Sequence, residues 1–170
     1  MQSIETSRLI LRPFTLDDVE AAYTMNLDED VSRYTGDGGV MSFEEIERRI
    51  REDVMGDYAR HGFGRFAVEW RETGAFIGFT GLKYLVDMDE VDLGYRFMSN
   101  YWGMGIATEA GKACIEFGFK ELGLERIIAM LLIENQSSIR VLEKLGFQFE
   151  KSFIEDGLII QQYAIGQQIL

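Results

Sequence analysis

Residues 102–109 read Trp102-Gly103-Met104-Gly105-Ile106-Ala107-Thr108-Glu109, and they lie between a predicted strand and a predicted helix. Two glycines within three residues let the backbone turn tightly, with several N–H groups pointing the same way. The helix that begins near Ile106 adds the partial positive charge of its N-terminus. Because no lysine or arginine occurs in residues 100–110, the segment predicts an anion site, suited to a pyrophosphate, that is built from backbone amides.

The spacing of these glycines does not fit the common phosphate-binding motifs. Gly103, Gly105 and Thr108 give G-x-G-x-x-T rather than G-x-G-x-x-G, and the sequence has no G-K-[ST]. A dinucleotide-binding unit would also need an early parallel βαβ arrangement, whereas three antiparallel strands are predicted before the loop. A purely structural interpretation, in which both glycines only turn the chain into a helix, stays open at this point.

Upstream of the loop, the hydrophobic pattern changes from helical spacing to short β-type runs. Thr15 with Asp18 and Ser42 with Glu45 resemble capping boxes, and apolar side chains at helical spacing follow each pair. The predicted elements are a strand at residues 6–14, helices at 15–26 and 42–58 with a glycine-rich loop at 35–39 between them, and an antiparallel meander of strands at 65–71, 75–82 and 91–98.

Downstream of the loop, the pattern predicts two more helices and three more strands. These are a helix at residues 106–122, a strand at 126–133, a helix at 135–145 and a hairpin of strands at 148–154 and 158–165. The whole order is β-α-α-β-β-β-α-β-α-β-β, which indicates an α/β fold with a mixed sheet. Because the sequence has no repeat, low-complexity tract or break in composition, we expect a single domain over residues 1–170.

Composition excludes several classes of function. With 17 Lys+Arg against 29 Asp+Glu, the net charge of -12 disfavours binding to nucleic acid or to an anionic membrane. One cysteine and one histidine cannot form an internal disulfide or a usual zinc site, so no metal is expected. The longest apolar run, at residues 127–133, is far shorter than the ~20 residues that span a bilayer, and residues 1–12 lack the apolar run of a signal peptide. We therefore expect a cytoplasmic protein.

A second informative segment, residues 135–147, begins with an N-cap and ends with a glycine. Asn135 is the predicted N-cap, Ile139 and Leu142 are predicted core positions, and Gly146 is predicted to end the helix. These structural roles do not exclude a functional one. The side-chain amide of an N-cap asparagine that lies beside the N-terminus of another helix is also placed to bind a polar ligand.

Together, these segments resemble the GNAT superfamily of acetyl-CoA-dependent N-acetyltransferases, and more closely its RimJ/RimL-like branch. The family has the same order of strands and helices, and the resemblance covers nearly the whole chain. Trp102 departs from the Gln or Arg of the general family pattern but is usual in this branch. Four motifs carry the resemblance: Thr6-x-Arg8-Leu9-x-Leu11-Arg12-Pro13, Leu93-Gly94-Tyr95, Trp102-Gly103-x-Gly105-x-Ala107-Thr108-Glu109-Ala110, and Asn135-x-x-Ser138-x-x-Val141-x-Glu143-Lys144-x-Gly146-Phe147.

The resemblance implies where acetyl-CoA is held. Backbone N–H groups of residues 104–108 would bind the pyrophosphate of coenzyme A, and the end of the preceding strand would pair with the pantetheine amides. Two residues of the second segment would lie along the pantetheine arm near the thiol. The implied cofactor-binding residues are Phe97, Met98, Trp102, Gly103, Met104, Gly105, Ile106, Ala107, Thr108, Asn135 and Ser138.

The family chemistry is direct attack of a primary amine on the acetyl thioester in a ternary complex, with no metal. The implied acceptor is a protein N-terminal amine, such as that of a ribosomal protein, or a small amine. An α-amine with a pKa of ~7.8 costs about 1.1 kcal/mol to deprotonate at pH 7, against about 4.6 for lysine. The acceptor site would be built from loops at residues 34–41 and 82–90, and the protein would be a monomer or a homodimer.

Two catalytic roles follow from the resemblance. Asp92 is the candidate general base, ahead of Glu90 and of His61, which is expected to be a surface loop residue. Many family members have a tyrosine as general acid at the position of Leu142, so Ser138 is the nearest replacement, either as the acid or as a hydrogen-bond donor to the cofactor. The vacancy at Leu142 also supports an alternative, a non-catalytic acyl-CoA-binding regulatory module, which the presence of Asn135 and Ser138 disfavours.

Overall fold

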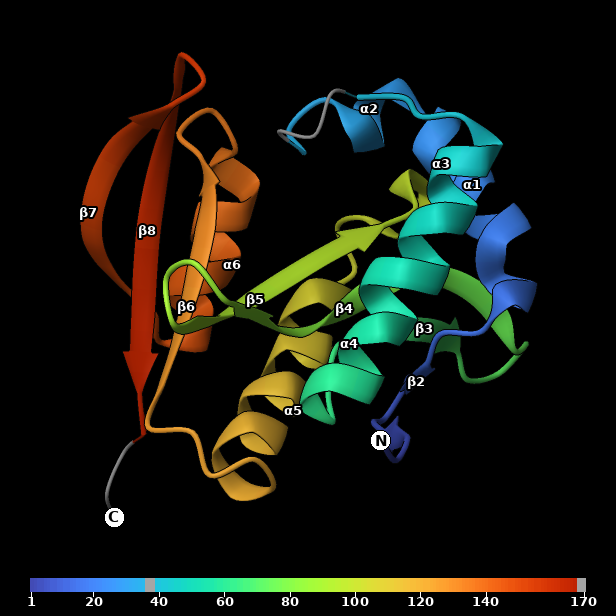
Figure 1. Ribbon diagram of the computed structural model, residues 1–170, viewed down its shortest axis with the longest axis horizontal. Helices are drawn as coiled ribbons and strands as arrows, with labels where there is room; N and C mark the ends of the chain where they lie inside the picture. Colours follow the sequence, from blue (N-terminus) through green and yellow to red (C-terminus); the bar gives the residue numbers. More distant parts are fainter. Residues whose placement is uncertain (36–38, 168–170) are drawn as a thin grey trace.

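One eight-stranded sheet runs through the computed structural model, which describes residues 1–35 and 39–167 (Figure 1). Its strand order is β1-β2-β3-β4-β5-β6-β8-β7, and every described pair is antiparallel except β5 with β6, which is parallel. This confirms the predicted mixed, mostly antiparallel sheet. The strands are β1 (Ile4–Glu5), β2 (Leu9–Pro13), β3 (Arg65–Trp70), β4 (Ala75–Leu85), β5 (Glu90–Phe97), β6 (Arg126–Leu132), β7 (Gln148–Glu155) and β8 (Leu158–Gly166).

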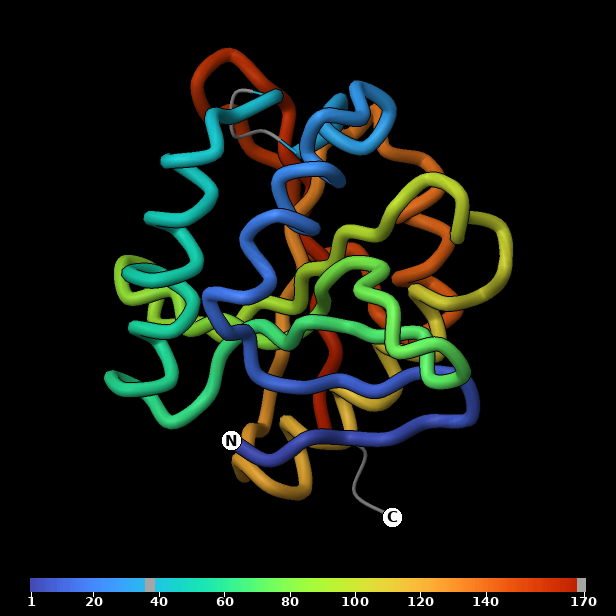
Figure 2. Tube along the Cα trace, turned by 90° about the vertical axis from the view of Figure 1, so that its right-hand side faces the viewer, coloured from blue at the N-terminus to red at the C-terminus, as the bar shows by residue number. Residues whose placement is uncertain are grey.

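Helices cover both faces of the sheet, as Figures 1 and 2 show from two directions. On one face, Val19 and Ala22 of α1, Ile46 of α3 and Ile50 of the π-helical stretch after α3 pack in the smaller apolar cluster. On the other face, α5 and α6 cover the main core. The helices are α1 (Val19–Leu27), α2 (Glu29–Ser32), α3 (Phe43–Arg48), α4 (Met55–His61), α5 (Ile106–Lys120) and α6 (Gln136–Leu145).

The predicted order of elements is confirmed, with local differences in the first third of the chain. The first predicted strand, residues 6–14, forms as β2, and the short strand β1 before it was not predicted. The Thr6 N–H donates to the Leu9 carbonyl (2.9 Å) and turns the chain between β1 and β2. The short helix α2 was not predicted. The second predicted helix contains a π-helical stretch, Arg49–Val54, between α3 and α4. The predicted loop at residues 35–39 lies mostly outside the described residues.

The feature that positions the site is the separation of β5 from β6. Their parallel register joins Asp92 to Ile128, and the two strands then diverge towards their C-terminal ends (Figure 1). The Met98 N–H donates back to Ile77 of β4 (2.9 Å). Since backbone groups alternate sides along a strand, those of Tyr95 and Phe97 face the gap rather than β4. The gap therefore offers one strand edge for an extended ligand to pair with.

Candidate active site

The loop before α5 has the conformation that its glycines predict. Gly103 and Gly105 have φ angles of +75° and +76°, in the left-handed region that glycine adopts without strain. Gly105 is the N-cap of α5, and because it has no side chain, none of its atoms caps the first-turn amides. A fifteen-residue helix also brings the positive end of its dipole to this point. The loop therefore presents backbone N–H groups that are suited to an anion.

Two contacts fix the loop while leaving most of it at the surface. The Trp102 indole N–H donates to the Phe97 carbonyl (2.9 Å), which ties the loop to the end of β5. Ile106 is only 2% exposed and anchors the start of α5 in the core, whereas Trp102 and Met104 are exposed. The loop is thus tied to the end of β5 by Trp102 and anchored in the core by Ile106, while Trp102 and Met104 stay at the surface.

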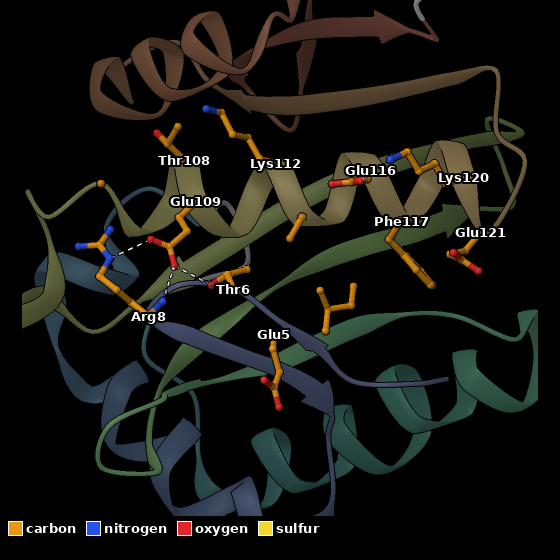
Figure 3. Close-up of a pocket in the computed structure, with 13 residues that line it drawn as sticks. Glu5, Thr6, Arg8, Thr108, Glu109, Lys112, Glu116, Phe117, Lys120 and Glu121 are labelled. Carbon is orange, nitrogen blue, oxygen red and sulfur yellow. Dashed lines mark hydrogen bonds and ion pairs between the residues drawn. The ribbon is translucent and has the colours of Figure 1, made fainter.

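Glu109 ties the first turn of α5 to the N-terminal segment (Figure 3). Its carboxylate accepts hydrogen bonds from the Thr6 hydroxyl (2.6 Å), the Arg8 backbone N–H (3.0 Å) and the Arg8 Nε (2.8 Å). Burial alone would raise the pKa of Glu109, but these donors outweigh it and the pKa is lowered. All three residues lie in sequence motifs, but the motifs alone indicate no role for them. The only signal was their presence in two motifs about a hundred residues apart.

A surface groove of about 650 Å³ runs along α5 beside this contact. It borders the loop at Gly105 and Thr108 and continues past Lys112, Glu116 and Lys120 (Figure 3). No residue of β5, β6 or α6 lines it. The groove therefore lies beside the anion site but does not reach the gap where the sheet opens.

The second segment forms α6 as predicted, with Asn135 as its N-cap. The Asn135 Oδ1 accepts hydrogen bonds from the Ser138 N–H and the Ser137 hydroxyl, both at 3.3 Å. Gly146 ends the helix with a φ of +95°. Leu142 is 2% exposed in the core, so it has a packing role where many family members have a tyrosine. Ser138 is half-buried in the first turn, near the gap.

Asp92 lies at the point where β5 and β6 separate, and both of its carboxylate oxygens are engaged. Oδ2 is 2.8 Å from Arg65 Nη2 of β3, and Oδ1 accepts the Met130 N–H of β6 (3.3 Å). Burial raises the pKa of Asp92, and Arg65 opposes the rise. Gly94 leaves room for Arg65, since a Cβ there would lie 2.6 Å from its guanidinium. The carboxylate thus links three strands where the parallel ladder stops.

The structure does not bring the two predicted catalytic residues together. Asp92 and Tyr95 are three positions apart on β5 and so point to opposite faces of the sheet. Tyr95 packs with the core on the α6 side, where Ser138 lies. Glu90 is held by Arg126 (3.0 Å) at the start of β5. His61 is the last residue of α4, rather than a loop residue, and its ring packs on Tyr84 at 5.1 Å.

A second hollow, of about 560 Å³, lies beside Met130 and contains part of the predicted acceptor region. Residues 83–88, at the turn between β4 and β5, form one wall. The other predicted acceptor loop, residues 34–41, includes residues 36–38, which lie outside the described part of the chain. Acidic and basic side chains balance in this hollow, so the excess negative charge of the chain is not gathered there. The acidic residues are Asp57, Asp87 and Glu155, and the basic residues are Arg60, Lys83 and Lys151.

Within residues 1–35 and 39–167, no group of three or more His, Cys, Asp or Glu side chains is placed to hold a metal ion. Over the same part of the chain, no helix is both long and apolar enough to span a membrane.

Helix-end amides beside a splayed pair of parallel strands, within an otherwise antiparallel sheet, define the acyl-CoA-dependent acetyltransferase class. The chain belongs to the GNAT family, because residues 8–148 match the sequence profile of the acetyltransferase (GNAT) domain. Members of this family transfer an acetyl group from acetyl-CoA to an amine. The residues described above fit this cofactor, since the uncapped amides at the start of α5 suit its pyrophosphate.

Individual relatives agree with this assignment. The chain is similar to the uncharacterized N-acetyltransferase YoaA of Bacillus subtilis, with 34% identity over 86% of this chain and 83% of that protein. It is also similar to the spermidine N(1)-acetyltransferase of Escherichia coli, with 27% identity over 90% and 80% of the two chains. A GNAT-family acetyltransferase structure from Bacillus anthracis superimposes with a TM-score of 0.83 at 29% identity, over 97% and 98% of the two chains.

Proposed function

We propose that the protein acetylates a primary amine, either the N-terminal amine of a protein, such as a ribosomal protein, or a small amine. We further propose that residues 1–170 form one domain. We also propose that the protein belongs to the RimJ/RimL-like branch of the family. Trp102 in the loop and Ser138 in α6 support the branch, and the named activity of the spermidine-acetylating relative supports a small amine. The observation that carries the proposal is the uncapped start of α5 beside the gap between β5 and β6.

Acetyl-CoA supplies the acetyl thioester that the amine attacks directly. We assign its pyrophosphate to the amides of residues 104–108. The Met98 N–H is already bonded to Ile77, and the Phe97 carbonyl accepts from Trp102, so neither of these two groups is free for pantetheine. We therefore assign the strand-like pairing to the remaining backbone groups of Tyr95 and Phe97 that face the gap. The Asn135 Oδ1 caps α6, which leaves its carboxamide nitrogen to donate to the pantetheine arm.

A general base at Asp92 stays a prediction, and the contacts favour a different role. A base must take a proton from the amine, but this carboxylate is buried and held by Arg65 and by the Met130 amide. An α-amine is deprotonated at a cost of only about 1.1 kcal/mol at pH 7, so such an acceptor needs little help. We propose that Asp92 fixes β6 relative to β5 and β3 at the point where the parallel ladder stops.

Ser138 as the general acid also stays a prediction. Its place on the first turn of α6, where the Asn135 side chain holds its backbone N–H, supports this role. Replacing Ser138 with Ala should lower kcat while leaving the affinity for acetyl-CoA nearly unchanged. An unchanged kcat would contradict the assignment.

The decisive test is thiol release from acetyl-CoA with a panel of amines, alongside calorimetric binding of acetyl-CoA. The panel contains spermidine, peptides with free N-termini and the same peptides with acetylated N-termini as matched controls. We expect turnover with at least one free amine and none with its blocked counterpart. Binding without any turnover would support the alternative, a non-catalytic acyl-CoA-binding module.

The cytoplasmic location and the oligomeric state, monomer or homodimer, stay predictions. The final hairpin, β7 with β8, and its apolar residues Ile159 (43% exposed) and Ile160 support a dimer. Sedimentation at several protein concentrations would measure the oligomeric state.

A further inference from the structure

The hollow beside Met130 lies on the face of the sheet opposite to α5. Ala129 belongs to the main core under α5 and α6, and since side chains alternate along a strand, Met130 points to the other face. Asp92 lies on that same face, because Leu93 beside it belongs to the main core. The Met130 N–H donates to Asp92 (3.3 Å) where the parallel ladder stops. The hollow is therefore placed at the point where β5 and β6 separate.

The turn between β4 and β5 exposes two apolar side chains at this hollow. Val86 is 68% exposed and Met88 is 39% exposed, and both line it. The turn is fixed, because the Tyr84 hydroxyl donates to Asp89 (2.8 Å) and the Met88 N–H donates to the Leu85 carbonyl (3.2 Å). Exposed apolar side chains that gather at a concave surface are typical of an interaction site. A ligand would meet them in a pre-organised position.

The other side of the hollow is apolar as well. Met130 of β6 and Phe153 of β7 line it across from the turn between β4 and β5, which lies beside β6 in Figure 1. The hollow thus has apolar side chains on two sides and a volume of about 560 Å³. This volume lies in the range that small-molecule and peptide side-chain pockets have.

Charge in the hollow is balanced, and its buried carboxylate is already engaged. Three acidic and three basic side chains line the hollow, so it has no surplus of negative charge. Asp57 of α4 accepts a hydrogen bond from Arg60 Nη2 (2.9 Å) and lies 3.8 Å from Lys83 Nζ. A polyamine would bring several positive charges between apolar walls with no surplus carboxylate to pair with them, which is unfavourable. An amine that carries an apolar group fits better.

We propose that this hollow binds the acceptor, and that the acceptor is the N-terminal amine of a peptide or protein whose first side chains are aliphatic. Val86 and Met88 would then determine acceptor specificity. The inference rests on the proposed function and chooses between the two kinds of acceptor that it contains. In a ternary complex, acetyl-CoA would be held from the α5 side of the sheet, and the amine would reach the acetyl carbon from the opposite side.

An α-amine suits a hollow whose buried carboxylate is held by other side chains. With a pKa of ~7.8, about one α-amine in seven is neutral at pH 7, whereas an alkyl amine such as that of lysine has a pKa of ~10.4. The neutral nitrogen forms the C–N bond to the acetyl carbon, and the C–S bond breaks with its electron pair going to sulfur. The proton that the amine loses reaches the sulfur through solvent.

The test compares two hexapeptides with free N-termini that differ only in their second residue, leucine or aspartate, with spermidine as the third acceptor. We expect kcat/KM for the leucine peptide to exceed that for the aspartate peptide by roughly tenfold or more, since one aliphatic side chain is buried. Spermidine should be the poorest of the three acceptors.

Val86→Asp places a charge on the apolar wall at an exposed position, so the fold should tolerate it. For the leucine peptide, KM should rise by roughly tenfold while kcat stays within about twofold of wild type, because the substitution weakens binding of the acceptor and not the chemistry. Val86→Leu should keep the wild-type KM. Leu16→Asp is the matched control, since it adds the same charge at a 46% exposed leucine that does not line the hollow.

The possible outcomes separate the inference from the proposed function. A higher kcat/KM for spermidine than for either peptide would overturn the inference and leave the acetyltransferase activity in place. Equal kcat/KM values for the two peptides, or a wild-type KM in Val86→Asp, would also overturn it. If coenzyme A binds and no amine is acetylated, the proposed function itself fails.

Discussion

Two helices begin beside the gap between β5 and β6, and they differ in how their first-turn N–H groups are satisfied. α5 begins at Gly105, which has no side chain, so no N-cap side chain accepts a hydrogen bond from the first-turn N–H groups of α5. α6 begins at Asn135, whose side chain accepts from the Ser138 N–H. The first helix keeps its donors for a ligand, whereas the second uses them to fix its own first turn. The comparison assigns anion binding to α5 and the positioning of Ser138 to α6.

The largest effect should follow from making α5 resemble α6. Gly105→Asp adds a carboxylate that can cap the amides of the first turn, at a left-handed position that aspartate tolerates better than most residues. We expect the affinity for coenzyme A, measured by calorimetry, to fall by roughly 100-fold or more, since the carboxylate also repels the pyrophosphate. Pantetheine, which lacks the pyrophosphate, should bind both proteins alike.

A matched control for this change is Gly123→Asp, at an exposed glycine with a φ of +66° beyond the far end of α5. It should leave the binding of coenzyme A unchanged. Equal losses of affinity for coenzyme A in Gly105→Asp and Gly123→Asp would show that added negative charge, rather than the capping of α5, weakens binding.

A smaller effect should follow from releasing α5 from the N-terminal segment. Glu109→Gln removes the charge that holds Thr6 and Arg8, and hydrogen bonds to charged groups contribute about 1.5–3 kcal/mol. We expect a loss of stability near the lower end of that range in chemical denaturation, and weaker binding of coenzyme A by roughly tenfold. Glu116→Gln is the control, because its ion pair with Lys120 is exposed and its loss should barely change stability.

The corresponding change at α6 should affect catalysis more than binding. Asn135→Ala removes the N-cap and should lower the free energy of unfolding by about 1 kcal/mol. Asn135→Asp keeps an acceptor for the cap but loses the nitrogen donor. If kcat falls in the alanine variant and recovers in the aspartate variant, the residue acts by holding Ser138. If neither variant changes kcat, α6 does not position a catalytic group.

The smallest effect should be a pH dependence of the stability that the Glu109 contact with Thr6 and Arg8 contributes. The pKa of Glu109 lies below its ordinary value of 4.5, so its contribution to stability is present above pH 4.5 and is lost as pH falls through the native pKa. The difference in Tm between wild type and Glu109→Gln should therefore shrink on acidification below pH 4.5. A difference that stays constant down to pH 3 would contradict this account of the contact.

Residue patterns that are local in sequence predicted the order of elements, the glycine turns before α5 and the two ends of α6. Gly103, Gly105 and the hydrophobic spacing after them lie within one turn or one helix, and the same is true of Asn135 and Gly146. The contacts between distant segments were not predictable in this way. The resemblance predicts Asp92 as a base, and nothing near it in sequence indicates that Arg65 and the Met130 amide hold its carboxylate. The Thr6–Glu109 bond joins residues 103 positions apart.

Tyr95 illustrates the same limit on one strand. Its residue type and its place in the Leu93-Gly94-Tyr95 motif were visible in the sequence, but the direction of its side chain depends on the register of β4 with β5 and on where β6 separates. A shift of one residue would have turned the hydroxyl to the opposite face of the sheet.

The most direct test of the central claim is to follow the backbone amide resonances of Gly105, Ile106, Ala107 and Thr108 by NMR as ligand is added. Coenzyme A should shift these resonances strongly, whereas pantetheine should leave them nearly unchanged and shift those of Tyr95 and Phe97. Saturable binding of coenzyme A that leaves the four amide resonances in place would contradict the assignment of the α5 N-terminus as the pyrophosphate site.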